Sequence, residues 1–307
     1  MTFRLALAWA LLVGGIGSFW CCRPWLPPTA FAFGQVVALM LSWKVASLLC
    51  LPPSEWSRFT PLRFIAYCLF PGMQPRQFLR GQRLVPGAPV PTVTAVLVNA
   101  AAGAALVWLA PRLLPAATPL AIRFWVALVG FTLLALFARL DFYALIFRVL
   151  GFPVEKFWDC PVAAVTLGEF WGRRWNRLVT GLLRDVLWLP LARRVGAGRS
   201  LFAVFLYSGF YHEAVSFLTG SGYGGPTLYF LIQYAGVAVE NRRPVHRALQ
   251  AHPWLSRAWT AAAVVAPVGL LVQPRLVEQY LLPMLVEAGV PGLLGADGHT
   301  RVRSIPA

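Results

Sequence analysis

The chain has 307 residues, of which 58% are hydrophobic and 12% are charged, and its mean hydropathy is +0.65. A soluble domain is usually about a quarter charged, so this composition excludes an ordinary water-soluble protein. The formal net charge is +16 at pH 7, but the arginines are spread over several segments instead of forming one basic stripe. Nucleic acid is therefore excluded as the expected partner, and loops against anionic lipid headgroups are favoured.

Apolar runs of about 20 residues, the length that crosses about 30 Å of hydrocarbon, recur along the chain. Since backbone amides in lipid need internal hydrogen-bond partners, we predict that these runs are helices. The first run has a basic start like a signal peptide but no convincing cleavage site, so it is interpreted as a span. In chain order the predicted spans are 3–20, 29–51, 91–110, 118–138, 200–219, 226–240 and 258–273, with 177–191 and 276–290 as weaker candidates.

The basic segments between these spans, 52–90, 139–199 and 241–257, all fall on one side of the predicted topology. The excess of basic residues in cytoplasmic loops then predicts a cytoplasmic N-terminus and an integral, multi-pass protein of a bacterial inner membrane. No internal repeat is visible, so we expect a single domain over 1–307 with a motif core at about 139–240. The cysteines and histidines show no spacing typical of a metal site or a disulfide framework, and no metal is expected.

The segment 139–199 is too charged to span simply and too aromatic for a free linker. Its start, "RLDFYALIFRVLGF", mixes basic and large apolar residues, which is typical of an amphipathic helix at the membrane interface. The alternative is a solvated connector with a few apolar anchors.

Two ionisable residues, His212 and Glu213, lie in the middle of the predicted span 200–219, within "LYSGFYHEAVSFLTG". A charged group at the centre of a span costs at least about 2.5 to 3.5 kcal/mol, so a functional reason is expected. Imidazole accepts a proton near neutral pH, which makes His212 the candidate general base. The alternative for His212 is a hydrogen bond that joins two helices. Neighbouring helical residues point about 100° apart, so we expect Glu213 to have another task, an ion pair with an arginine of another segment.

Two polar segments thus stand out in the chain, and the one around His212 is the second. The first polar segment, "TLGEFWGRRWNRLVTGLLRDVLWLPL" at 166–191, mixes basic and aromatic residues as is typical of the headgroup level. Its arginines can bind the phosphates of a nucleotide-bearing donor such as coenzyme A, because the guanidinium fork matches phosphate oxygens. A basic belt on anionic lipid is the equally favoured alternative. The candidate substrate-binding residues are Glu169, Trp171, Arg173, Arg174 and Trp175.

The two segments resemble the wax synthase branch of the membrane-bound O-acyltransferases (MBOATs), in which an "FWGRRWN" stretch precedes an "SGxxHE" helix. This chain has "FWGRRWN" at 170–176 and "SGFYHE" at 208–213. Weaker similarity extends to "SWKVASLLC" at 42–50 and to "PTLYFLIQYAGVAVE" at 226–240, which is similar to the family's "T-x-FF" helix. The resemblance implies an all-α integral membrane protein of about eight transmembrane helices, with interfacial and re-entrant helices around a buried tunnel.

The resemblance also implies acyl transfer from acyl-CoA, as a co-substrate without a further cofactor, to the hydroxyl of a lipophilic alcohol. His212 is the implied general base, and Asn176 either orients the donor or donates a hydrogen bond to the developing oxyanion. Gln233 stands where the family more often has histidine, which leaves the acceptor open: another hydroxyl, of a sterol, diacylglycerol or secondary metabolite, is the first alternative. A transporter is disfavoured because no repeat is found. We expect Lys44 to pair with a buried carboxylate such as Glu213 or Glu240.

Overall fold

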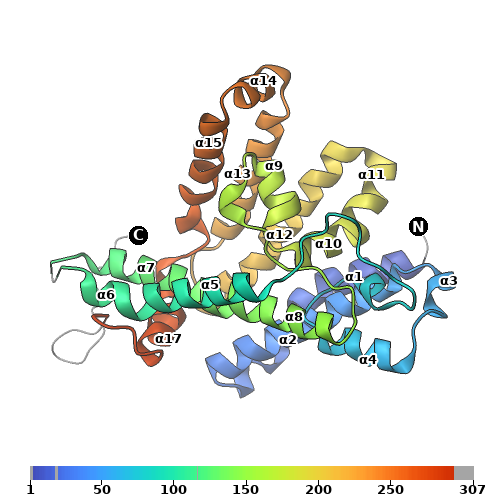
Figure 1. Cartoon of the computed structure of the whole chain (residues 1–307), viewed down its shortest axis with the longest axis horizontal. Coiled ribbons are helices and arrows are strands. Elements are labelled where there is room, and N and C mark those ends of the chain that lie inside the picture. Colours follow the sequence, from blue (N-terminus) through green and yellow to red (C-terminus); the bar gives the residue numbers. More distant parts are fainter. Residues whose placement is uncertain (1–2, 18–19, 116, 294–307) are drawn as a thin grey trace. The chain divides into compact units, whose positions relative to one another are not determined.

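The computed structural model describes residues 3–17, 20–115 and 117–293, and within these ranges every regular element is a helix (Figure 1). The predicted all-α class is therefore confirmed for this part of the chain. The chain divides into two compact units, one of residues 1–88 and 157–271 and one of residues 89–156 and 272–307. Each unit is described by itself, and the single domain over 1–307 stays a prediction.

The larger unit holds both polar segments. Its elements are α1 (Phe3–Gly17), η1 (Trp20–Trp25), α2 (Pro28–Leu49), α3 (Pro53–Trp56), α4 (Pro61–Leu69), η2 (Pro75–Phe78), η5 (Pro161–Ala163), α9 (Leu167–Glu169), η6 (Phe170–Arg174), α10 (Arg177–Leu183), η7 (Arg184–Trp188), α11 (Leu189–Val195), α12 (Ala197–Thr219), α13 (Gly225–Glu240), α14 (Arg243–Ala251), α15 (Pro253–Val265) and η8 (Val268–Leu270).

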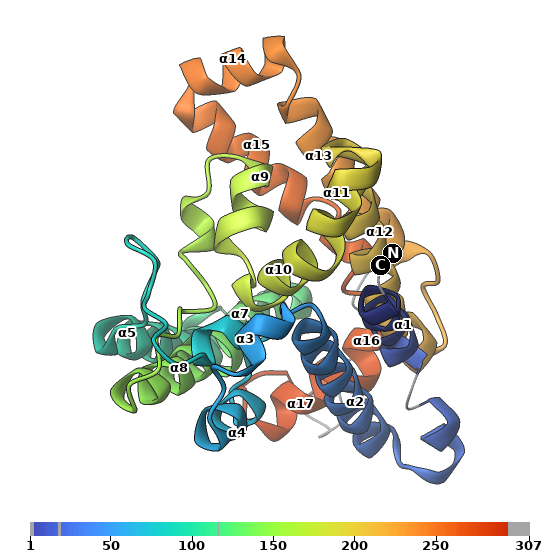
Figure 2. The same cartoon turned by 90° about the vertical axis from the view of Figure 1, so that its right-hand side faces the viewer.

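Two apolar clusters hold this unit together. The first joins α1, α2, α10, η7 and α12 around Trp43, Leu182 and Tyr207. The second joins α9, α12 and α13 around Leu167 and Phe230. Figures 1 and 2 show α13, α14 and α15 as a helical hairpin with α14 at its tip. The segment 166–176 packs along α13, from Glu240 at the helix end next to α14 to Gln233 in the middle of the helix. This brings the polar segment 166–191 to the helix that follows the segment of His212.

The smaller unit consists of α5 (Val93–Ala104), η3 (Ala105–Leu109), α6 (Ala110–Leu113), α7 (Leu120–Thr132), η4 (Leu133–Ala138), α8 (Arg139–Val149), α16 (Pro274–Leu276), η9 (Val277–Leu281) and α17 (Leu282–Glu287). Its two long helices approach closely at a pair of glycines, since a Cβ on Gly103 would lie 2.8 Å from the carbonyl oxygen of Gly130. Small residues at such crossings are typical of helices that pack in lipid.

Two helices of the described residues are long and apolar enough to cross a membrane, Val93–Leu113 and Leu120–Val149. A third span results if Pro253–Leu270 and Pro274–Glu287, bent by 75°, are counted as one. The apolar helices Phe3–Gly15 and Phe33–Leu49 are shorter, and residues 18 and 19 of the predicted first span lie outside the described residues. The total of about eight spans and the buried tunnel stay predictions.

The helix expected at the start of segment 139–199 is not a separate element, and its place at the membrane interface stays a prediction. Residues 120–149 form one helix of 30 residues, so the start of that segment continues the preceding span. At 1.5 Å per residue this helix is about 45 Å long, which exceeds about 30 Å of hydrocarbon, so its length is sufficient for its charged end to lie at the interface.

Candidate active site

The "SGFYHE" motif of α12 lies against the beginning of α13. A Cβ on Gly209 would lie 2.8 Å from the Cα of Thr227, so only glycine permits this approach of the two helices. The carboxylate of Glu213 accepts hydrogen bonds from the backbone N–H groups of Gly224 at 3.2 Å and Thr227 at 3.0 Å, and from the Thr227 hydroxyl at 2.8 Å. A negative charge at a helix N-terminus is favourable, because the free N–H groups there carry partial positive charge.

The predicted ion pair between Glu213 and an arginine is therefore wrong. Its three donors come from the start of α13, and this arrangement satisfies a buried carboxylate without a cation. The motif's glycine and glutamate together fix α12 on α13, and His212 lies between them in the sequence.

His212 is partly exposed, and its ring stacks on Phe230 of α13 with 4.9 Å between ring centroids and 20° between the planes. The Tyr211 ring contacts it edge-on at 4.7 Å. In the part of the chain that the structure describes, neither nitrogen of the imidazole has a hydrogen-bond partner. The alternative in which His212 joins two helices by a hydrogen bond is thus not observed there, and both nitrogens remain free to meet a ligand.

The first polar segment is held by a compact set of hydrogen bonds around Glu169. The Thr166 hydroxyl accepts from the Glu169 N–H at 3.0 Å, and the Glu169 carboxylate accepts from the Val165 N–H at 2.8 Å, a reciprocal N-terminal cap. Arg174 pairs with the same carboxylate at 2.7 Å and donates to the carbonyl of Asp159 at 2.9 Å.

Burial raises the pKa of Glu169, but the Val165 N–H and the Arg174 guanidinium outweigh it, and the net result is a lowered pKa. Glu169 and Arg174 are thus paired with each other, whereas Arg173 is exposed. Of the two arginines predicted to bind a donor phosphate, Arg173 is exposed, whereas Arg174 is partly buried and stabilises the segment through Glu169 and the carbonyl of Asp159.

Asn176 ends this segment and begins α10. Its φ is +41°, a left-handed conformation that asparagine tolerates better than most residues. Its side-chain oxygen accepts a hydrogen bond from the Val179 N–H at 3.4 Å, which caps the helix. Within the described residues the side-chain amide nitrogen has no acceptor, so its two hydrogens are available to a ligand.

The two polar segments meet through α13. The Trp171 indole donates to the side-chain oxygen of Gln233 at 3.1 Å, and its ring lies 5.5 Å from that of Phe230. Phe230 stacks on His212 with its ring, so a single aromatic side chain touches both motifs. Trp175 stacks on Phe170 at 5.4 Å and so supports the turn before Asn176.

Residues of α13 thus organise the site, and sequence reasoning missed two of them, Thr227 and Phe230, and expected another partner for Glu240. Thr227 donates to Glu213 and Phe230 stacks on His212. Glu240 accepts from the N–H groups of Leu167 at 2.8 Å and Gly168 at 3.3 Å, just before the "FWGRRWN" motif. The helical spacing of three residues between Thr227 and Phe230 is a signal that could have placed these two on one face of the helix.

The predicted carboxylate partner of Lys44 is wrong. Its ammonium group donates to the carbonyl oxygens of Tyr67 at 2.7 Å, Phe70 at 2.7 Å and Gly72 at 3.0 Å, and it lies 4.1 Å from the centre of the Tyr67 ring. A buried ammonium is satisfied here by carbonyl dipoles at the end of α4 instead of by a counter-charge.

The sequence profile of the membrane bound O-acyl transferase family matches residues 154–233, the segment that contains both motifs, so the chain is similar to that family over this segment.

Among the relatives are plant proteins of Arabidopsis thaliana. "Probable long-chain-alcohol O-fatty-acyltransferase 3" is 34% identical over 43% of this chain and 42% of its own length. "Probable long-chain-alcohol O-fatty-acyltransferase 7" is 32% identical over 43% of each chain, and "Acyl-CoA--sterol O-acyltransferase 1" is 38% identical over 22% of this chain and 21% of its own. The matches thus span less than half of each relative. No solved structure matches the chain significantly. Because the relatives come from a plant, the expected bacterial inner membrane gains no support from them.

Proposed function

We propose that the protein transfers a fatty acyl group from acyl-CoA to the hydroxyl of a lipophilic alcohol within the membrane, with His212 as general base. The observation that carries the proposal is the imidazole of His212, partly exposed, stacked on Phe230 and without a hydrogen bond in the described part of the chain. Phe230 also contacts Trp171 of the "FWGRRWN" segment, so the candidate base and the candidate donor-binding segment both contact the same aromatic side chain.

The reaction needs one group that accepts and returns a proton. In this proposal, a nitrogen of His212 accepts the proton of the alcohol hydroxyl as its oxygen attacks the thioester carbonyl carbon. The tetrahedral oxyanion then collapses, the carbon–sulfur bond breaks, and the coenzyme A thiolate takes the proton from the imidazolium. The products are an ester and free coenzyme A thiol, and the imidazole is neutral again.

Asn176 is proposed to donate from its amide nitrogen to the oxyanion or to the acyl donor. Its oxygen is occupied by the cap of α10, which fixes the orientation of the amide and leaves the two N–H bonds as the free side. The exposed guanidinium of Arg173 is proposed to bind a phosphate of coenzyme A, since guanidinium and phosphate match in geometry and charge.

Long-chain alcohols are the proposed acceptors, because the names of several relatives specify them. A sterol is the second candidate, which the sterol O-acyltransferase among the relatives favours. The two assignments share one mechanism and differ in the shape of the space that admits the acceptor. Paired libraries of acyl-CoA thioesters and alcohols, assayed with the purified protein in lipid, distinguish them.

The test of the base is a pair of substitutions at His212. His212→Ala removes the ring, and His212→Phe keeps an aromatic ring for Phe230 to stack on while it removes the proton acceptor. Both variants should insert, fold and lose transfer. His246→Ala, at an exposed histidine of α14, is the matched control and should retain activity. Turnover retained by either His212 variant would refute the proposed base.

A further inference from the structure

The short helix α4 (Pro61–Leu69) has an outer face without a single polar side chain. Leu62 and Leu69 are 72% and 73% exposed and Ile65 is 53% exposed, and these positions follow the spacing of one helix face. The other exposed residues of the helix are Pro61, Phe64 and Cys68. A helix that faces water carries polar residues on its outer side, whereas the outer side of α4 is apolar.

The opposite face of α4 is firmly held, which fixes the direction of the apolar one. Ala66 and Tyr67 are buried, and the Tyr67 hydroxyl lies 2.7 Å from the Ser47 hydroxyl of α2. Lys44 of α2 binds the carbonyl oxygens of Tyr67, Phe70 and Gly72 at the end of the helix. Rotation of α4 to bury its outer face would break these contacts.

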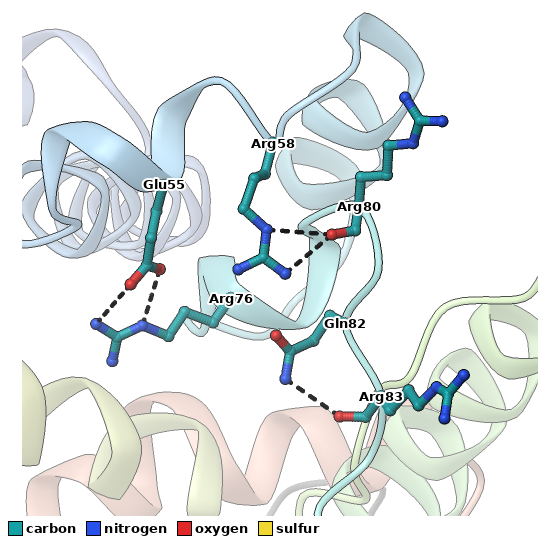
Figure 3. Close-up of polar contacts among 6 residues, drawn as sticks. All are labelled: Glu55, Arg58, Arg76, Arg80, Gln82 and Arg83. Carbon is teal, nitrogen blue, oxygen red and sulfur yellow. Dashed lines mark hydrogen bonds and ion pairs between the residues drawn. The ribbon is translucent and has the colours of Figure 1, made fainter.

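The residues around α4 are strongly basic. The segment 52–90 contains five arginines and one glutamate, and that glutamate, Glu55, is paired with Arg76 at 3.0 Å. Arg58 donates to the carbonyl of Arg80 at 2.9 Å, and the guanidinium groups of Arg80 and Arg83 point away from the other residues drawn (Figure 3). In the described part of the chain, neither of these two exposed guanidiniums makes a hydrogen bond or ion pair.

Nine residues of helix extend about 14 Å, which is too short to cross about 30 Å of hydrocarbon. We propose that α4 lies along the membrane surface with its outer face in the acyl chains of one leaflet, and that Arg80 and Arg83 bind the phosphates of anionic lipid headgroups. Apolar residues beside arginines are the composition of such interfacial helices. The proposal concerns a part of the molecule remote in sequence from His212 and does not depend on the proposed reaction.

Two native cysteines provide the test. Cys68 on the outer face of α4 and Cys160 in the loop before η5 are both free and exposed. The natural chain, one copy in each lipid nanodisc, is treated with a charged, water-soluble maleimide, and peptide mass spectrometry reads the rate at each thiol. Cys68 should react at least about tenfold more slowly than Cys160, because the reagent does not enter hydrocarbon. Equal rates would overturn the proposal.

A second copy of the chain is the other possible occupant of this face. Discs that hold one copy exclude it, so protection there comes from lipid. If Cys68 is reactive in single-copy discs and protected only in discs with two copies, the face is a dimer interface and the proposal fails.

The headgroup part is tested by lipid charge. In discs of phosphatidylcholine with about 30% phosphatidylglycerol, Cys68 should be better protected than in phosphatidylcholine alone. Each arginine near an anionic surface contributes about fivefold in binding, so Arg80→Gln with Arg83→Gln should reduce this lipid-dependent gain by up to about 25-fold. Arg193→Gln with Arg194→Gln, an exposed pair on α11, removes the same charge and should leave the gain intact. Equal losses in both double variants would overturn the headgroup assignment.

Discussion

Replacing Asn176 by aspartate separates the two tasks that the structure allows for this residue. Aspartate caps a helix as well as asparagine and also tolerates a left-handed φ, so the cap to Val179 and the start of α10 should survive. The substitution removes the amide N–H groups, which are the proposed donors to the substrate. Stability should therefore stay near that of the natural chain while the chemistry suffers.

The expected loss follows from the role of such donors. Removing one hydrogen-bond donor to an oxyanion typically lowers kcat by about 10² to 10³, or about 2.7 to 4 kcal/mol. Asn176→Gly is the matched neutral variant: glycine accepts φ +41° freely, and loss of the cap side chain costs only a few tenths of a kcal/mol. It should show a similar fall in kcat without an added negative charge.

The Asn176→Ala variant should also lose much of its turnover rate, but this substitution lowers stability as well as removing the donor. A left-handed alanine costs about 1 to 2 kcal/mol and the lost cap about 1 more, so stability falls together with rate. The assay is initial rates in proteoliposomes with acyl-CoA and a long-chain alcohol, together with the thermal midpoint of each variant. If the aspartate and glycine variants both keep a kcat near that of the natural chain, the donor role is refuted and Asn176 is a helix cap alone.

Three further predictions concern neighbouring contacts. Gly209→Ala should push α12 from α13, with about 1 to 3 kcal/mol of overpacking and a loss of turnover, whereas Gly198→Ala on the same helix meets no atom within 4 Å and should be neutral in thermal midpoint and rate. Arg173→Ala should raise the Michaelis constant for acyl-CoA with little effect on stability. Arg174→Ala should lower the thermal midpoint, because it breaks a partly buried ion pair. If Arg173→Ala changes the Michaelis constants for acyl-CoA and alcohol equally, a basic belt on anionic lipid is favoured over binding of the donor phosphate. Lys44→Met should lower the thermal midpoint, since burial of a carbonyl without a donor costs about 1 to 3 kcal/mol, and an unchanged midpoint would contradict the assigned cage.

Several features of this protein follow from composition and local pattern. The apolar runs predict helices in lipid, because the backbone has no other way to satisfy its amides there. The position of His212 in the middle of an apolar run marks it as unusual without knowledge of its neighbours, and the order of the two motifs points to the family whose profile matches residues 154–233.

What only the tertiary structure decided is the partner of each polar side chain. Helical periodicity gives the side of the helix on which Glu213 and Lys44 lie, but it does not show which other element packs against that side. We therefore expected a charged partner for each residue, an arginine for Glu213 and a carboxylate for Lys44. The structure pairs them with backbone groups instead, Glu213 with the N–H groups that begin α13 and Lys44 with the carbonyl groups that end α4. Every chain carries such groups at each helix end regardless of its side chains, so the sequence leaves them unmarked and only the packing of helices selects which end a charge meets.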